Sequence, residues 1–421
     1  MSKTEWKEYR LGEIYEVHNG LSKGREFFGS GYPFISFSTV FNKWFIPEII
    51  TDLAQTTESE QESYSIKAGD ILVTRTSETA DELGMSCVAL RDIPNATYNG
   101  FCKRMRQYNK DVDVDSKYVG YYMRNPEFRK NFQAFAGSMS TRASLTNDAL
   151  LGLTIKLPPL AEQQRIAKIL SSLDDKIELN NAINRNLEEQ AQAIFKSWFI
   201  DFEPFGGNEF VDSPIELKIP KSLKMVQIEE VPHTLETGRR PKGGAVSEGI
   251  PSIGAENVKQ LGVFDFSSNK FIPREFAESL GKGKINGYEL LLYKDGGKPG
   301  TFMPHFSMFG EGFPYEECYI NEHVFKLDFG DKGLNIFAYF YFQMDHVVSW
   351  LANNGGKAAI PGINQNDVNA IWIYDLSNPK VKEFGNIAKP MFEQILKNCK
   401  QNRQLAILRD AFLPKLMSKK D

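Results

Sequence analysis

Two long segments of the chain have apolar residues spaced as in paired helices. From Ile166 to Trp198 the recurring apolar positions are separated alternately by four and three residues, and a second such stripe runs from Phe384 to Leu416. A spacing that averages 3.5 residues over four heptads keeps one face of a helix against one partner helix. The two stripes therefore predict two long helices that pair as a coiled coil, each being the simplest partner of the other.

Both stripes contain two asparagines at the same depth, Asn180 and Asn184 in the first and Asn398 and Asn402 in the second. A buried asparagine lowers the stability of a coiled coil but fixes its register, because sliding the helices would leave amide groups unpaired. We therefore expect the four asparagines to meet in the seam and set the register. The alternative is that they lie on a solvated face.

The second half of the chain repeats the first at a constant shift of 218 residues. Pro33 and Val40 fall on Pro251 and Val258, and both halves end in the same helical stripe. A repeat of this length predicts two copies of one structural unit. If a pseudo-two-fold axis relates the copies, the two helices run antiparallel. About 33 residues at a rise of ~1.5 Å per residue would then hold two lobes roughly 50 Å apart.

The sequence before each stripe indicates a lobe of mixed α and β structure. Short runs such as Ile71–Thr74 and Leu290–Tyr293 alternate with Gly and Pro turns, and one helical segment extends from Ser116 to Phe135. The predicted fold class is α+β, with two pseudo-symmetric lobes separated by two long antiparallel helices that form a coiled coil. The expected boundaries are residues 1–156 and 204–376 for the lobes, and 157–203 and 377–421 for the helical segments.

Composition and motifs point to no catalytic site. The four cysteines are scattered singly, which predicts free thiols in a reducing compartment and argues against structural zinc. The five histidines lack metal-binding spacing. Residues 296–301 lack the spacing of a phosphate-binding loop, and residues 125–128 lack the second proline of the methyltransferase Asn-Pro-Pro-aromatic tetrad, so a helical turn is predicted there. No segment has the ~20 apolar residues of a membrane helix, so we expect a soluble, cytoplasmic protein.

The segment from Leu157 to Ile177, LPPLAEQQRIAKILSSLDDKI, and its continuation to Phe199 closely resemble the central region of type I restriction-modification specificity subunits. Residues 69–72, 321–325 and 355–364 resemble the target-recognition domains of that family. The resemblance implies that residues 1–156 and 204–376 are such domains, each reading one half of a split DNA sequence, and that the two helices set the gap between the halves. The second helical segment departs from the pattern, because it begins at Asn378 without a Pro-Pro-Leu-x-Glu-Gln entry, and docking of one modification subunit there is in question.

The same resemblance implies partners for the chain. These are double-stranded DNA, two adenine-methylating modification subunits docked on the helices, and a restriction subunit that acts as motor and nuclease. The chain itself is expected to bind no cofactor, with S-adenosylmethionine, ATP and Mg on the partner subunits. Its net charge of −4 provides no general basic footprint. That charge supports a rival hypothesis, a two-lobed protein scaffold that never contacts DNA. A stand-alone nuclease is a third possibility.

Candidate DNA contacts are polar residues in the loops of each lobe. Arginine suits guanine and asparagine suits adenine in the major groove, so Arg75 and Arg142 are assigned to guanine, and Asn42 and Asn257 to adenine. The predicted base-reading set is Ser36, Ser38, Asn42, Arg75, Thr76, Ser138, Thr141 and Arg142 in the first lobe, and Glu256, Asn257, Lys294, Lys298 and Lys357 in the second. The predicted phosphate contacts are Lys23, Arg25, Arg239, Arg240 and Lys242.

Overall fold

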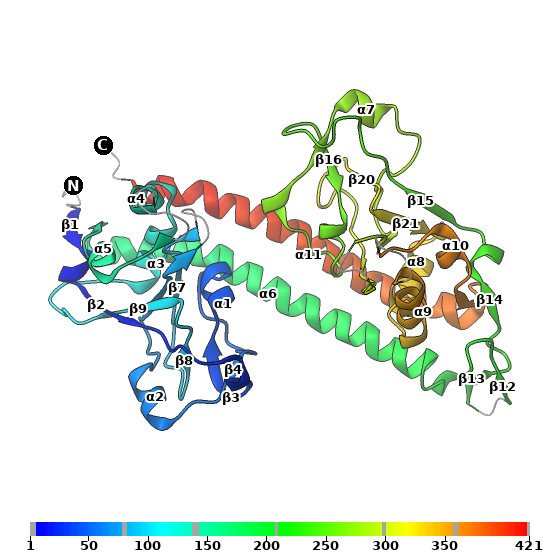
Figure 1. The fold of residues 1–421 in the computed structure, drawn as a ribbon, viewed down its shortest axis with the longest axis horizontal. Coiled ribbons are helices and arrows are strands. Elements are labelled where there is room, and N and C mark those ends of the chain that lie inside the picture. Colours follow the sequence, from blue (N-terminus) through cyan, green and yellow to red (C-terminus); the bar gives the residue numbers. More distant parts are fainter. Residues whose placement is uncertain are drawn as a thin grey trace. The chain divides into compact units, whose positions relative to one another are not determined.

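The computed structural model describes residues 6–77, 82–136, 143–206, 209–296, 300–356 and 361–418. The chain forms two compact units, one of residues 1–175 and 405–421 and the other of residues 176–404. Each unit contains one lobe together with part of two long helices, α6 (Leu160–Phe199) and α11 (Pro379–Met417) (Figure 1). Both helices lie within the helical segments expected from the sequence.

The lobe of the first unit is built on two small sheets. The antiparallel sheet β2-β9-β5-β7 consists of β2 (Tyr15–Asn19), β9 (Cys102–Gln107), β5 (Ile71–Thr74) and β7 (Ser86–Val88). In the sheet β4-β3-β8, β3 (Phe28–Ile35) is antiparallel to β4 (Leu53–Ala54) and parallel to β8 (Thr97–Tyr98). Two ladders pair β1 (Lys7–Arg10) with β11 (Thr154–Leu157), and β6 (Thr76–Ser77) with β10 (Ala143–Ser144). The helices are α1 (Phe37–Asn42), α2 (Glu58–Ser63), α3 (Ser116–Arg124), α4 (Pro126–Ala136) and α5 (Asn147–Leu151), with 3-10 turns at Leu11–Glu13 and Arg25–Phe27.

The lobe of the second unit has the same two sheets. Its antiparallel sheet β15-β21-β18-β19 consists of β15 (Thr234–Thr237), β21 (Val324–Asp328), β18 (Leu290–Tyr293) and β19 (Phe306–Ser307). In the sheet β17-β16-β20, β16 (Ile250–Ile253) is antiparallel to β17 (Phe271–Ile272) and parallel to β20 (Tyr319–Ile320). Two ladders pair β14 (Met225–Gln227) with β22 (Trp372–Tyr374), and β12 (Phe210–Asp212) with β13 (Lys218–Pro220). The helices are α7 (Arg274–Glu278), α8 (Lys332–Tyr341), α9 (Asp345–Gly355) and α10 (Gln365–Asn369), with 3-10 turns at Glu203–Phe205, Ile228–Glu230, Ala255–Asn257 and Phe266–Ser268.

Matching strand order and direction in the two lobes confirm the predicted internal repeat. The predicted strands Ile71–Thr74 and Leu290–Tyr293 are β5 and β18. The single helix predicted from Ser116 to Phe135 is instead two helices, because Pro126 cannot continue a helix from α3 and begins α4. The side chain of Asn125 accepts a hydrogen bond from the Glu127 backbone N–H (3.2 Å), so residues 125–128 form the predicted helical turn.

Within the second unit, α6 and α11 run antiparallel and the four seam asparagines meet. Asn180 Nδ2 donates to Asn402 Oδ1, and Asn398 Nδ2 donates to Asn184 Oδ1, each at 2.8 Å. Asn180 is only 1% exposed, which contradicts the solvated-face alternative. Asn180 and Asn398 are repeat-related, as are Asn184 and Asn402. The two bonds are therefore equivalent under the local two-fold relation expected of a 218-residue repeat. The predicted pairing is therefore confirmed, and the role of the asparagines in setting register stays a prediction.

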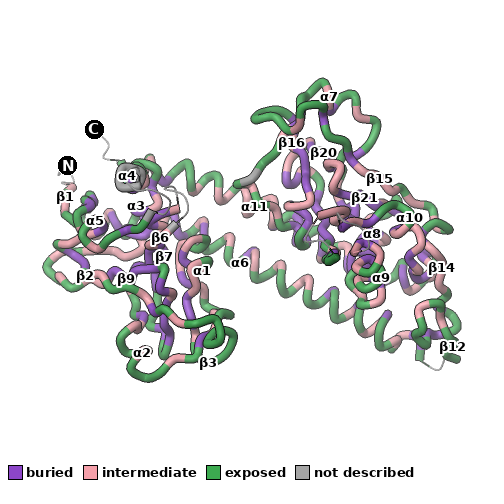
Figure 2. The backbone as a smooth tube through the Cα atoms, in the orientation of Figure 1, coloured by how far each residue is buried: buried purple, intermediate pink, exposed green. Residues whose placement is uncertain are grey.

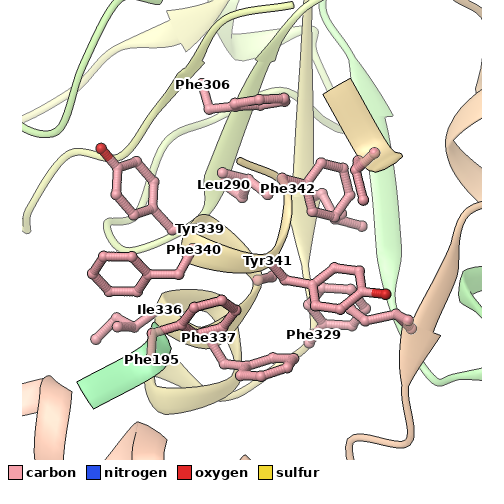
Figure 3. Packing of buried hydrophobic residues seen from close by; sticks show 14 of the residues in the cluster. Phe195, Leu290, Phe306, Phe329, Ile336, Phe337, Tyr339, Phe340, Tyr341 and Phe342 are labelled. Carbon is pink, nitrogen blue, oxygen red and sulfur yellow. The ribbon is translucent and has the colours of Figure 1, made fainter. Parts of the chain in front are cut away.

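Each lobe packs its core against both long helices. In the first unit these helices contribute mainly aliphatic side chains, among them Ile166 and Leu170 of α6 and Leu413 of α11. In the second unit they contribute aromatic rings, and Phe195 lies 5.6 Å from Phe340 between ring centroids (Figure 3). Buried residues concentrate in the central strands of both lobes, among them β5 and β18 (Figure 2). The burial of these apolar side chains is the main stabilising contribution to each unit.

All four cysteines are free thiols, as predicted. Across the described residues no helix is both long and apolar enough to cross a membrane. The same residues contain no group of three His, Cys, Asp or Glu side chains placed to hold a metal ion.

Candidate nucleic-acid interface

Three loop segments emerge at one end of the four-stranded sheet in the first lobe. Strands β2 and β5 end there, at Asn19 and Thr74, and the antiparallel β9 begins there at Cys102. Residues 21–22, 75–76 and 99–101 therefore lie at one edge, and we call them the first loop cluster. Loops placed at one edge of a rigid sheet are a common position for binding residues.

Backbone hydrogen bonds hold the first loop cluster in place. Arg75 N donates to Phe101 O (2.8 Å), and Asn99 Oδ1 accepts from Phe101 N (2.8 Å). Leu21 N donates to Tyr98 O (2.8 Å), which brings the first segment against the third. A side chain on the preceding Gly20 would place its Cβ 2.1 Å from Asn99 O, so only glycine permits this close approach.

The second lobe forms an equivalent second loop cluster from residues 239–240, 294–295 and 321–323. Lys294 N donates to His323 O (3.0 Å), and Asn321 Oδ1 accepts from His323 N (2.9 Å). The side chain of Lys294 donates to Glu322 O (2.8 Å), just as Arg75 Nη1 donates to Gly100 O (3.4 Å). Gly238 repeats the role of Gly20, because its Cβ would lie 1.8 Å from Ile320 O. The two clusters therefore share one backbone frame.

The side chains carried by that frame differ between the lobes. In the first cluster Phe101 is 60% exposed and lies next in space to Arg75. In the second cluster the corresponding residue is His323, which contacts Asp295 through Nδ1 and lies 3.3 Å from Glu322 Oε1 through Nε2. Two cations join this network, since Lys294 lies 3.5 Å from Asp295 and Arg240 lies 3.7 Å from Glu322. One surface is thus aromatic and basic, and the other is a network of mixed charge.

The residues on the strands next to these clusters also differ. Strand β9 carries Lys103, 3% exposed, whose Nζ donates to Asn19 Oδ1 (2.8 Å) and contacts the side chain of Asn147. Burial lowers the pKa of Lys103, and the charge of Arg75 lowers it further. The corresponding residue of β21 is the buried Phe325, with Lys294 Nζ 5.5 Å from its ring centroid. The interior charge of the first lobe is therefore absent from this position in the second.

Five of the predicted contact residues lie in the segments that form the two loop clusters. They are Arg75 and Thr76 in the first lobe, and Arg239, Arg240 and Lys294 in the second. Glu256 is paired with Lys270 (2.5 Å); partial burial tends to raise its pKa, but this bond and the charges of Lys270 and His323 bring the pKa below its usual value. Glu256 is therefore an ionised neighbour of the second cluster.

Three further predicted residues gather on one short helix. Ser36 caps α1, its Oγ accepting from Thr39 N (3.3 Å), and Asn42 Nδ2 donates to Ser38 O (3.0 Å). Ser38 and Asn42 are exposed, as are Arg25 and Lys242 elsewhere. Whether these residues contact DNA stays a prediction. Ser138, Thr141, Arg142, Lys298 and Lys357 lie outside the described residues.

The surroundings of two predicted contacts do not favour a role in DNA binding. Asn257 is 3% exposed and its Oδ1 accepts from Gly254 N (3.1 Å), so it stabilises a turn and does not face a base. Lys23 bonds to Glu60 (2.8 Å) and to Gln55 O (2.7 Å), so its charge is already engaged within the lobe. Sequence reasoning also missed Phe101 and His323. The sequence signal that could have pointed to both residues is the asparagine that lies two positions before each of them, Asn99 and Asn321.

Comparison with known proteins finds similarity to one family. Residues 3–189 match the family model for the type I restriction modification DNA specificity domain. The chain is 26% identical over 427 residues to the type I restriction enzyme MjaIX specificity subunit of Methanocaldococcus jannaschii, covering 98% of this chain and 93% of that protein. It is also 34% identical over 205 residues to the type I restriction enzyme HindI specificity subunit of Haemophilus influenzae, covering 48% of this chain and 42% of that protein.

The fold is shared with a solved structure as well. The crystal structure of a type I restriction-modification system S subunit from M. genitalium has a TM-score of 0.56 to this chain at 14% identity, covering 99% of this chain and 97% of that one. The sequence matches and this shared fold agree with the repeat, the two lobes and the paired helices described above. Residues 3–189 thus match the type I restriction modification DNA specificity domain, and the chain as a whole is similar to type I restriction enzyme specificity subunits.

Proposed function

We propose that this chain is the DNA sequence-specificity subunit of a type I restriction-modification enzyme and that it binds a bipartite target. Each loop cluster reads one half of that target. The observation that carries this proposal is the pair of equivalent backbone frames holding different side chains, Arg75 and Phe101 in one and Lys294 and His323 in the other. A fixed backbone frame that carries different side chains suits two sites of similar geometry that recognise different base sequences.

The energetics favour two half-sites over one. Each well-placed bidentate contact contributes roughly 1–3 kcal/mol of discrimination, so one lobe that reads a few base pairs is only moderately selective. Once one lobe has bound, the other encounters a high effective concentration of its own half-site. The selectivities of the two lobes then multiply. The net charge of −4 means that phosphate contacts must come from local cations and from partner subunits.

The chemistry of the enzyme is assigned to partner subunits. We propose that two modification subunits, which bind S-adenosylmethionine and methylate adenine, dock on α6 and α11, and that a restriction subunit carries out ATP- and Mg-dependent cleavage. The chain itself then contributes recognition and assembly and no catalytic step. Its relatives in Methanocaldococcus jannaschii and Haemophilus influenzae, named as specificity subunits, support this division. Activity in the cytoplasm, where the host DNA lies, is part of the same proposal.

The test is selection from random duplexes by the chain assembled with its modification subunits. We expect enrichment of two short conserved blocks separated by a gap of fixed length. A stable assembly that enriches no sequence would contradict the proposal and favour a protein scaffold. Metal-dependent cleavage by the purified chain alone would contradict it in favour of a nuclease.

A second experiment tests whether the helices set the gap. Removing one heptad from α6 and the opposed heptad from α11 retains the antiparallel pairing of the seam. The enriched target is expected to keep both blocks and to have a shorter gap. A change in the blocks themselves would show that the helices take part in reading the bases.

A further inference from the structure

We propose that Phe101 determines the specificity of the first lobe by contacting the 5-methyl group of a thymine in its half-site. This inference rests on the proposed function and adds a residue and a base to it. The methyl group lies in the major groove and is recognised by apolar side chains such as phenylalanine. Phe101 was not among the residues predicted from the sequence, and its placement depends on the loop geometry.

The first argument is the exposure of the ring. At 60% exposure, Phe101 is the most exposed aromatic residue of the described chain. Leaving a large apolar side chain in water forgoes the stabilisation that its burial would contribute. A ring left so exposed at a strand end suits a contact that forms only when a ligand binds.

The second argument is the rigidity of the position. Phe101 N is held by Asn99 Oδ1 (2.8 Å), its carbonyl oxygen accepts from Arg75 N (2.8 Å), and β9 begins at the next residue. The close approach of Gly20 braces the same loop. A ring carried on such a frame is already ordered, so little conformational entropy is lost when it meets a base.

The third argument separates DNA from a protein partner. A protein-docking site usually presents a contiguous apolar patch. The other side chains of the cluster segments include Ser22, Arg75 and Thr76, which are polar, while Leu21 is buried. An apolar ring beside an arginine suits a base edge next to a phosphate backbone.

The repeat supplies the fourth argument. The equivalent position in the second lobe is His323, within a network of Asp295, Glu322 and two cations. A surface that bound the same kind of subunit on both lobes would have similar chemistry in both. A surface that reads two different half-sites would not, so the difference favours base recognition.

The experiment replaces thymine by deoxyuridine, which removes only the methyl group. The assembly with modification subunits first selects its bipartite target, and each thymine of the half-site read by the first lobe is then replaced in turn. We expect one replacement to weaken wild-type binding about fourfold, the effect of losing one buried methyl group. The Phe101→Ala assembly is expected to bind the thymine duplex more weakly and to be indifferent to that replacement.

His323→Ala provides the matched control, because it changes the equivalent position of the other lobe. It is expected to retain the full response to deoxyuridine in the first half-site. Both variants must co-purify with modification subunits in wild-type amounts, which a surface-exposed substitution allows. The inference is overturned if the Phe101→Ala assembly keeps the wild-type response, if no thymine in that half-site responds, or if the variant fails in subunit assembly alone. Absence of any enriched target with the wild-type assembly would instead count against the proposed function.

Discussion

The two lobes differ most at the places where their backbones are most alike. Phe101 and His323 occupy the same position on the same hydrogen-bonded frame, and so do Lys103 and Phe325 on the adjacent strand. At these positions the first lobe has an exposed aromatic ring and a buried cation, whereas the second lobe has a buried aromatic ring and exposed charged groups. Backbone bonds and two glycines maintain the frame without depending on these side chains. The same frame therefore accommodates different side chains in the two lobes.

A similar contrast occurs where each lobe meets the long helices. In the first unit Arg409 Nη1 binds Asp174 Oδ1 (2.6 Å), and Tyr121 donates to the same carboxylate. In the second unit the repeat-related positions of this ion pair are Ala191 and Phe392, both buried in an aromatic cluster. The same junction is thus built once around a buried ion pair and once around aromatic rings in edge-to-face contact.

The largest effect is expected from breaking the ion pair. Asp174→Ala leaves Arg409 largely buried beside Trp44 with Asp410 (2.8 Å) as its remaining ionic partner. Breaking a buried ion pair costs about 3–5 kcal/mol, and the contact with Asp410 is expected to reduce that loss. Urea denaturation should show the first unit destabilised and the second unit unaffected. Changing Arg409 to alanine as well should restore part of the loss. A loss below about 1 kcal/mol for the single variant would show that the pair is not a main support of this junction.

The next effect comes from the close contact of α8 with α11 in the second unit. A Cβ on Gly385 would lie 2.8 Å from the backbone carbonyl carbon of Gly333, whereas the first unit has Ala167 at the repeat-related position. Gly385→Ala should therefore destabilise the second unit by about 1–3 kcal/mol through overpacking. Gly281→Ala, where a Cβ meets nothing within 4 Å, is the control and should change stability by less than about 0.5 kcal/mol. Equal effects in the two variants would contradict this account.

The smallest effect depends on pH. Burial lowers the pKa of His346 to about 4, although Asp345 opposes the shift, and the first unit has Phe128 at this position. Because the unfolded chain binds the proton more tightly than the folded one, the second unit should have its full stability above about pH 6.5 and lose stability as the pH falls toward 4. The effect is modest because His346 is partly exposed.

His346→Phe, which copies the first unit, is expected to remove this dependence. Denaturation at a series of pH values measures it. An unchanged slope in the variant would assign the pH dependence to other groups.

Much of the fold could be predicted because its signals are periodic. The heptad spacing gave both long helices, and the 218-residue shift gave two equivalent lobes. The division at Asn125 was missed because the helical pattern continues across Pro126, although the residue types favour a break.

The candidate site was predictable only in part. Arg75 and Lys294 directly follow clear strands, so their positions could be inferred. Phe101 and His323 are 222 residues apart, and a constant shift of 218 pairs Phe101 with the buried Tyr319 instead. Lys23 and Asn257 have suitable chemistry for DNA, but their ion pair and burial arise from contacts that no local pattern encodes.

The central claim is that each loop cluster reads its own half of the target. Its most direct test is selection from random duplexes by two assemblies, one with Arg75→Ala and one with Lys294→Ala. Both variants retain the backbone N–H groups that hold the loops. Each is expected to relax one block of the selected sequence, weakening binding to that block by about 5- to 150-fold, and to leave the other block and the gap unchanged. A variant that relaxed both blocks, or neither, would contradict the claim.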